Sequence, residues 1–155
     1  GRINPKFLEG TMNALDGSVG FLLSRAARSM KRALDARLSE YNITATQYIV
    51  LEVLREHDGA SLSLLGQKLY FDNPTITGIV DRMERDELVE RRRVAGDRRV
   101  INVFLTGKGK ALAQSTNQIA EAINREAMKT FSPQQELEFL NTLNTIWRTM
   151  NGKED

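Results

Sequence analysis

The sequence predicts a mainly α-helical protein with a small β-hairpin. Three observations predict this fold class. Apolar residues recur at helical spacing along most of the chain. Residues 62–86 have the pattern of two short helices joined by a tight turn. The pattern then becomes alternating over residues 88–105, which is typical of two paired strands. Helix, turn, helix and hairpin in this order predict a winged helix-turn-helix domain, flanked here by N- and C-terminal helices.

Composition limits the function classes. The 155 residues suffice for one domain with a real core. The chain has no cysteine, which excludes disulfides, thiol redox sensing and thiolate metal sites. No apolar stretch approaches the roughly 20 residues of a membrane span, and no signal-peptide pattern is visible, so we expect a cytoplasmic protein. Residues 1–13 lack periodicity and are expected to be an N-terminal arm or a cloning remnant.

The N-terminal third predicts two helices and a short strand. Residues 16–40 carry an apolar stripe that predicts a long helix. Thr44 and Gln47 have the spacing of a capping box, which starts a second helix that ends near Asp58. Residues 60–62 are expected to form a short strand that pairs with the hairpin.

The next two helices form the predicted helix-turn-helix. The first is expected over about residues 64–70, with Ser63 as its cap. Asn73 is expected to cap the second, with Pro74 in the first helical position, and this helix should run to about Asp86. The residues at helical spacing that mark its buried face are Ile76, Ile79 or Val80, and Met83. Its polar face carries Thr75, Thr77, Gly78, Asp81, Arg82 and Arg85.

The hairpin is rich in arginine. Its strands are expected at residues 88–94 and 99–105, with residues 95–98 at the tip. Residues 88–110 hold seven basic and two acidic side chains, a local charge of +5 against +2 for the whole chain. Such a patch is typical of phosphate binding, although solvated charges that discourage edge-strand pairing would look the same. Together with the preceding helix-turn-helix, it favours binding of duplex DNA.

The C-terminal third predicts two further helices. Thr106 is expected to cap a helix that reaches about residue 130, and Ser132 and Gln135 with Pro133 begin the last one. The terminal helices present more apolar surface than a small winged domain can cover. We therefore predict a helical dimerisation region (residues 14–43 and 107–150) around a DNA-binding region (residues 44–106). The alternative is a monomer in which these helices form an intramolecular cap.

Several motifs carry a family resemblance, which extends over about residues 15–150. They are Asn73-Pro74-Thr75-Ile76-Thr77, Val80-Asp81-Arg82-Met83-Glu84, Leu88-Val89-Glu90-Arg91, Asp97-Arg98-Arg99 and Leu105-Thr106-Gly107-Lys108-Gly109. The sequence resembles the MarR family of bacterial transcription regulators. The resemblance implies a homodimer that binds a pseudo-palindromic operator, usually as a repressor, and is released by a small effector. The DNA-binding residues expected from it and from the chemistry of the hairpin are Asn73, Thr75, Thr77, Gly78, Arg82, Arg93, Asp97, Arg98 and Arg99.

The sequence departs from the family pattern at two positions. Glu87 stands where the family usually has glycine, at a helix end that needs a left-handed turn. Gly78 lies in the middle of a helix, where glycine costs about 1 kcal/mol relative to alanine. Two interpretations of Gly78 remain open, which are close approach to DNA and helix packing.

The sequence shows no catalytic constellation, so we expect neither an enzyme nor a cofactor. His57 is the only histidine, and it lies at a helix end beside Asp58. The resemblance implies an effector site in which Arg25, Arg28 and Tyr48 hold an aromatic carboxylate, a phenol or an aryl acyl thioester. A solvated helix face with local ion pairs is the alternative. A rival function is a winged-helix module that binds an acidic protein partner, which a salt titration against duplex DNA would distinguish.

Overall fold

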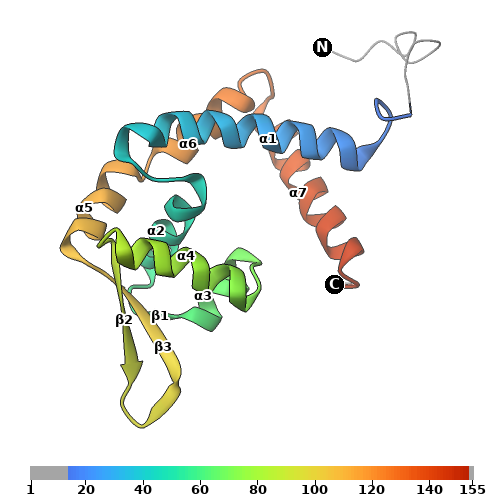
Figure 1. Cartoon of the computed structure of the whole chain (residues 1–155). Helices are drawn as coiled ribbons and strands as arrows, with labels where there is room; N and C mark the ends of the chain where they lie inside the picture. Colours follow the sequence, from blue (N-terminus) through green and yellow to red (C-terminus); the bar gives the residue numbers. More distant parts are fainter. Residues whose placement is uncertain (1–13, 154–155) are drawn as a thin grey trace. The chain divides into compact units, whose positions relative to one another are not determined.

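A computed structural model describes residues 14–153 (Figure 1). The expectation for residues 1–13 falls outside the described residues. The chain divides into two compact units between Ile119 and Ala120, and each unit is described by itself. No helix in the described part of the chain is long and apolar enough to cross a membrane.

The first unit opens with the predicted long helix. Helix α1 spans Val19–Leu38, and the Ser18 side chain accepts a hydrogen bond from the Phe21 N–H at its start. A 3₁₀ turn, η2 (Ser39–Tyr41), and a left-handed residue at Asn42 then reverse the chain. The Asp35 side chain near the end of α1 accepts a hydrogen bond of 2.8 Å from the Ala45 N–H, which ties α1 to the next helix.

Helix α2 spans Ala45–Glu56 and begins with the predicted capping box. The Gln47 N–H donates to the Thr44 side chain at 3.2 Å, and the Thr44 N–H donates to the Gln47 side chain at 3.1 Å. These two bonds satisfy two free amides of the first helical turn.

The helix-turn-helix consists of α3 (Leu62–Leu69) and α4 (Asn73–Arg85). Both predicted caps were wrong. Ser61 rather than Ser63 caps α3, accepting from the Leu64 N–H at 3.0 Å. Asp72 rather than Asn73 caps α4, accepting from the Thr75 N–H at 2.8 Å, because the left-handed Tyr70 ends α3 and leaves Asp72 extended. Hydrogen bonds from the Thr75 side chain and then from its backbone N–H lower the pKa of the Asp72 carboxyl, and its negative charge also suits the helix N-terminus.

The core lies between α2, α3, α4 and the sheet. The buried face of α4 is the predicted one, and both Ile79 and Val80 belong to it. Fully buried side chains come from each of these elements, and they include Leu51, Leu54, Leu65, Ile76, Val80, Met83, Val89 and Val103. This core holds α4 against the domain by one face and leaves its other face exposed.

The sheet has three antiparallel strands in the order β1-β3-β2. Strand β1 (Ala60–Ser61) pairs with β3 (Asp97–Leu105), as predicted, and β3 pairs with β2 (Val89–Val94). Strand β3 begins at Asp97, two residues earlier than expected, and the pairing shifts register between Arg93 and Val94. Strand β2 is therefore an edge strand, and it follows directly from the end of α4.

The end of α4 is the left-handed turn for which the family uses glycine. Glu87 has φ 61°, and the Leu88 N–H donates to the Met83 carbonyl at 2.9 Å. The Glu87 N–H donates to the Glu84 carbonyl at 3.0 Å, which completes a Schellman motif. A residue with a Cβ pays about 1–2 kcal/mol in this conformation. The wing therefore leaves α4 through a strained residue, as the sequence departure indicated.

The helix predicted from Thr106 to about residue 130 is two helices, α5 (Gly107–Thr116) and α6 (Ile119–Ala127). Thr106 caps α5 as expected. The Ser115 and Thr116 hydroxyls donate to the carbonyls of Ala111 and Leu112 four residues earlier. These bonds lie in the last turn of α5, and the chain leaves the helical pattern after Thr116.

The second unit contains most of α6 and all of α7 (Pro133–Met150). The predicted capping box is present, with the Gln135 N–H on the Ser132 side chain at 3.2 Å and the Ser132 N–H on the Gln135 side chain at 2.9 Å. No residue of α7 is buried. Its apolar side chains therefore remain available to another surface.

Candidate nucleic-acid interface

The exposed face of α4 carries the residues that the sequence singled out. Helical geometry places Thr75, Gly78 and Arg82 in one row beside the buried face, with Thr75 and Arg82 exposed and Gly78 half-buried. Asn73 and Thr77 lie on a neighbouring flank of the same helix, together with Asp81 and Glu84. The predicted polar face is therefore presented outward as a continuous surface.

Gly78 faces open space. A Cβ added at this position would meet no atom within 4 Å. Helix packing does not require glycine here, so this interpretation from the sequence is wrong. The close-approach interpretation stays a prediction.

The wing tip, residues 93–99, is exposed and positively charged. The Arg99 side chain is 93% exposed, and Asp97 accepts from the Arg99 N–H at 3.0 Å and pairs with its Nε at 3.4 Å. The Arg93 guanidinium donates to the Arg98 carbonyl at 2.7 Å, which braces the hairpin from strand to strand. Within residues 14–153, the Arg98 side chain has no carboxylate partner. The tip thus holds its arginines in place without neutralising all of them.

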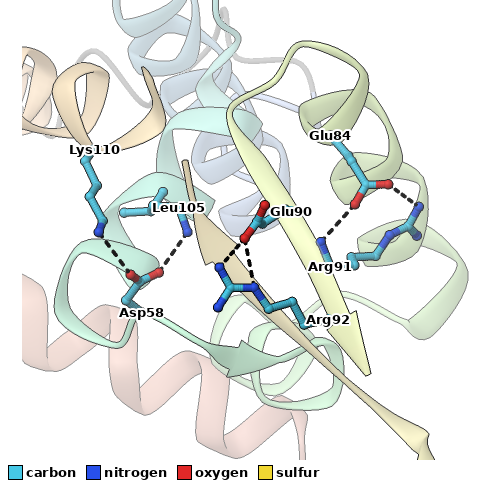
Figure 2. Close-up of polar contacts among 7 residues, drawn as sticks. All are labelled: Asp58, Glu84, Glu90, Arg91, Arg92, Leu105 and Lys110. Atoms are coloured by element: carbon cyan, nitrogen blue, oxygen red, sulfur yellow. Dashed lines mark hydrogen bonds and ion pairs between the residues drawn. The ribbon is translucent and has the colours of Figure 1, made fainter. Parts of the chain in front are cut away.

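Nearer the base of the hairpin, carboxylates pair with Arg91 and Arg92 (Figure 2). Arg91 forms ion pairs with Asp81 at 2.6 Å and Glu84 at 3.1 Å. Arg92 pairs with Glu90, and its guanidinium lies 4.2 Å from the centre of the Phe104 ring. The basic patch is therefore smaller than the charge count of the sequence indicated, because Arg91 and Arg92, like Arg99 at the tip, already have carboxylate partners.

Hydrogen bonding shifts the pKa values of Glu84 and Arg91 in opposite directions. The Arg91 side chain, followed by its backbone N–H, lowers the pKa of the Glu84 carboxyl. The same contact with Glu84 is the main cause that raises the pKa of Arg91. Both groups therefore stay charged over a wider pH range than usual, and the pair persists at neutral pH.

The N-terminus of α5 docks on the end of α4, a contact that sequence reasoning missed. The Thr106 N–H donates to the Leu88 carbonyl at 3.1 Å, and its hydroxyl donates to the Glu87 carbonyl at 2.6 Å. The Lys108 ammonium donates to the Asp86 carbonyl at 3.0 Å. A Cβ on Gly109 would lie 2.0 Å from the Leu88 oxygen, so only glycine fits. The fixed spacing of Leu-Thr-x-Lys-Gly was the signal that could have revealed this joint.

Asp58 secures the other side of the same joint (Figure 2). Its carboxylate accepts from the Leu105 N–H at 2.8 Å and lies 4.0 Å from the Lys110 ammonium. The neighbouring His57 ends α2 and is exposed. Among the described residues, no cluster of three or more potential metal ligands forms.

The three predicted effector residues do not line the cavity at the α4–α5 joint. Arg25 and Arg28 are exposed on α1, whereas Tyr48 on α2 is 2% exposed. A cavity of about 480 Å³ lies instead at the α4–α5 joint. It is lined by Tyr41, Asn42, Ile43, Asp86, Leu88, Lys108, Ala111, Leu112 and Ser115.

Comparisons with known proteins identify the family. Residues 43–101 match the model of the MarR family. The chain is 33% identical over 109 residues to the organic hydroperoxide resistance transcriptional regulator of Bacillus subtilis, covering 70% of this chain and 74% of that protein. It is 36% identical over 99 residues to the HTH-type transcriptional regulator TtmR of Methylorubrum extorquens, covering 64% of this chain and about half, 51%, of that protein. Both relatives are regulators rather than enzymes, as expected from the sequence.

Solved structures share the fold. S. aureus MepR aligns with a TM-score of 0.81 at 22% identity, over 85% of this chain and 98% of that one. Bordetella bronchiseptica BpsR aligns with a TM-score of 0.75 at 26% identity, over 83% of this chain and 97% of that one. The winged helix-turn-helix fold predicted from the sequence is confirmed. With its exposed α4 face, its basic wing tip and these relatives, the chain belongs to the MarR family of DNA-binding transcriptional regulators.

Proposed function

We propose that this chain is a homodimeric repressor that places α4 in the major groove and the wing tip on the flanking DNA backbone. The observation that carries the proposal is the row of Thr75, Gly78 and Arg82, with Thr75 and Arg82 exposed, on the same winged domain as an arginine tip that Asp97 neutralises only in part. Arginine and threonine side chains suit base edges and phosphates. The related fold of MepR has been solved in complex with DNA, which supports this use of the surface.

The proposed DNA-binding residues divide by role. Asn73, Thr75, Thr77, Gly78 and Arg82 would face the groove from α4. Arg93, Asp97, Arg98 and Arg99 would act at the wing, where Asp97 orients Arg99 and Arg93 braces the tip. A repressor of this kind acts where the DNA is, which in bacteria is the cytoplasm.

The dimer would use the terminal helices as the sequence divides them, residues 14–43 and 107–150. Val19 and Met30 on α1 are 61% and 38% exposed. On α7, Leu137 and Leu140 are 53% and 48% exposed. Apolar exposure of this extent marks an interface. A two-fold dimer would set two copies of α4 about 34 Å apart, one turn of duplex.

Binding to duplex DNA across a salt series tests the proposal. Random-sequence duplexes would first be selected on the protein, and the enriched site would then be titrated at several NaCl concentrations. We expect an inverted repeat as the site and a steep linear fall of log affinity with log salt. Analytical ultracentrifugation of the same sample should give a dimer. A DNA site without two-fold symmetry would contradict binding as a dimer. Binding that an acidic protein competes with, but duplex DNA does not, would support a winged-helix module for an acidic protein partner.

The proposed effector is a small aromatic acid held by Arg25 and Arg28 near Tyr48. BpsR is a protein whose DNA binding is regulated by 6-hydroxynicotinic acid, an aromatic acid, which supports this ligand class. Two exposed guanidinium groups can bind a carboxylate through paired hydrogen bonds. The chain has no cysteine, so it would not sense oxidants through a thiol. The effector would act by binding better to a dimer arrangement that does not fit the operator.

The double variant Arg25→Ala/Arg28→Ala should keep operator affinity and lose release by aromatic acids. Both side chains are exposed on α1 and belong to none of the contacts that hold α4 or the wing, so DNA binding should be within about twofold of the parent. The measurement is operator binding by fluorescence anisotropy with a panel of aromatic carboxylates. Arg32→Ala, one turn further along α1, is the matched control. Full release of the double variant, with loss of release in Leu112→Trp, would place the effector in the cavity at the α4–α5 joint instead.

Gly78→Ala should stabilise the protein and weaken operator binding. Alanine is favoured over glycine inside a helix by about 1 kcal/mol, and the added methyl meets nothing in the free protein. Thermal unfolding checks the stability, and anisotropy with the operator checks the affinity. An unchanged operator affinity would show that glycine is not needed for close approach of α4 to DNA.

A further inference from the structure

Arg91 connects the wing to α4 through three contacts. Its guanidinium reaches Asp81 at 2.6 Å and Glu84 at 3.1 Å. Its backbone N–H donates to the other oxygen of the Glu84 carboxylate at 2.9 Å. Figure 2 shows both contacts with Glu84, which lies on α4 facing strand β2. One carboxylate thus holds the side chain and the backbone of the same residue.

The backbone contact is informative because β2 is the edge strand of the sheet. An edge strand has outward-facing N–H groups that find no hydrogen-bond acceptor on a neighbouring strand. At Arg91 this group is satisfied by a side chain of α4. The outer edge of the wing is therefore attached to the helix, and the hairpin is held along its first strand as well as at its root.

The root of the wing is a short connection between α4 and β2. Only three residues, 86–88, separate α4 from β2, and Glu87 among them is in the left-handed conformation. The carbonyls of this root accept hydrogen bonds from Thr106 and Lys108, and the contacts of Arg91 add a second attachment further along β2. Asp81 and Glu84 are three residues apart on one flank of α4, which places both carboxylates toward the strand.

We propose that Arg91 is a positioning residue that sets the angle between the wing and α4, and that it does not take a DNA phosphate itself. Its guanidinium is occupied by two carboxylates and its side chain is only 28% exposed, whereas that of Arg99 is 93% exposed. The inference rests on the proposed DNA-contacting roles of α4 and the wing tip. It separates Arg91, which orients the wing, from the arginines of the wing tip, which contact DNA.

The decisive variant is Glu84→Gln. A phosphate contact by Arg91 and a clamp between Arg91 and Glu84 predict changes of opposite sign in operator affinity. If Arg91 is free to contact phosphate, removal of a neighbouring negative charge should leave operator affinity unchanged or raise it. If Glu84 and Arg91 form a clamp, the wing loses its angle and affinity falls although the protein has become more positive. Hydrogen bonds to charged groups contribute enough that we expect a fall of about three- to tenfold.

Glu90→Gln is the matched control. It removes the same charge from strand β2 itself, where Glu90 pairs with Arg92 of the same strand rather than with α4. Operator affinity should be unchanged or slightly raised. Arg91→Lys completes the set, because lysine keeps the charge that a phosphate requires but lacks the planar fork that two carboxylates require. The clamp predicts that Arg91→Lys binds as weakly as Glu84→Gln.

A double-mutant cycle separates positioning from a general loss of stability. The single variants Glu84→Gln and Arg91→Gln and the double variant would be compared in operator binding, at a temperature where thermal unfolding shows all of them folded. In a clamp, the double variant binds no more weakly than the weaker single one. If the fold losses of operator affinity in the two single variants multiply in the double variant, the proposal is overturned. A Glu84→Gln variant that binds the operator at least as tightly as the parent would also overturn it.

Arg99→Ala, measured beside these variants, distinguishes the failure of this inference from that of the proposed function. If Arg99→Ala weakens binding and Glu84→Gln does not, the wing contacts DNA and the clamp is wrong. If neither variant changes operator affinity, the wing does not take part in binding, and both the proposed wing contact and the clamp are wrong.

Discussion

Gly109→Ala is expected to lower the free energy of unfolding by about 3 kcal/mol or more, the range of severe single substitutions. The added Cβ would lie 2.0 Å from the Leu88 oxygen and 3.3 Å from a Leu105 methyl. The obstructing atom is backbone, so it cannot move aside as a flexible side chain would. Alanine gains at most about 1 kcal/mol in helix propensity, which is too little to offset the clash.

The clash would also open the joint between α4 and α5. To escape the Leu88 carbonyl, α5 must withdraw, and it then loses the bonds of Thr106 and Lys108 to the carbonyls of residues 86–88. We expect a melting temperature lower by roughly 10 °C in differential scanning calorimetry. DNA binding should fall as well, because this joint supports the end of α4.

Gly107→Ala is the control for this prediction. It lies two residues earlier in the same helix, and a Cβ there would meet nothing within 4 Å. Its melting temperature should equal or exceed that of the parent. If Gly109→Ala melts at the same temperature as Gly107→Ala, the close approach to Leu88 does not constrain the fold.

Arg99→Ala is expected to weaken operator binding by roughly tenfold to a hundredfold for the dimer, at about 0.15 M salt, and to reduce its salt dependence. Each phosphate contact contributes about 0.9 to the slope of log affinity against log salt, and the dimer would lose two. The Arg99 side chain is 93% exposed and held by Asp97, so it is oriented without being buried. Anisotropy titrations over a series of NaCl concentrations measure both quantities.

Arg92→Ala provides the comparison within the same hairpin. Its guanidinium is paired with Glu90 and lies over the Phe104 ring, so the substitution should change the slope less than Arg99→Ala does. Thermal unfolding of both variants would show whether lost packing on Phe104 contributes. Equal slopes for Arg99→Ala and the parent protein would contradict a phosphate contact at the wing tip.

The order and type of the elements could be predicted from the sequence because local forces decide them. The capping boxes at Thr44 and Ser132 and the buried face of α4 appear in the structure where their spacing predicted them. The change of period at residue 88 marked the hairpin. These features depend on interactions within a few residues, and such interactions are visible in a linear pattern.

The positions of helix caps and helix ends were harder to predict from the sequence. Asp72 and Asn73 are both good cap residues, and the choice between them followed from the left-handed Tyr70 that ends α3. The break after Thr116 divides a stretch whose apolar spacing predicted one continuous helix. In each case two local solutions have similar energies, and small backbone differences select one.

The sequence by itself determined the family, the fold class and the polar face of α4, because apolar periodicity and motif spacing encode them directly. Only the tertiary structure decided which arginines are occupied and which glycine is indispensable. Arg91 meets Asp81 and Glu84, and Gly109 meets the Leu88 carbonyl, once the hairpin and α5 have folded back on the end of α4. Such contacts join residues from different elements, so their partners depend on the packing geometry rather than on spacing along the chain.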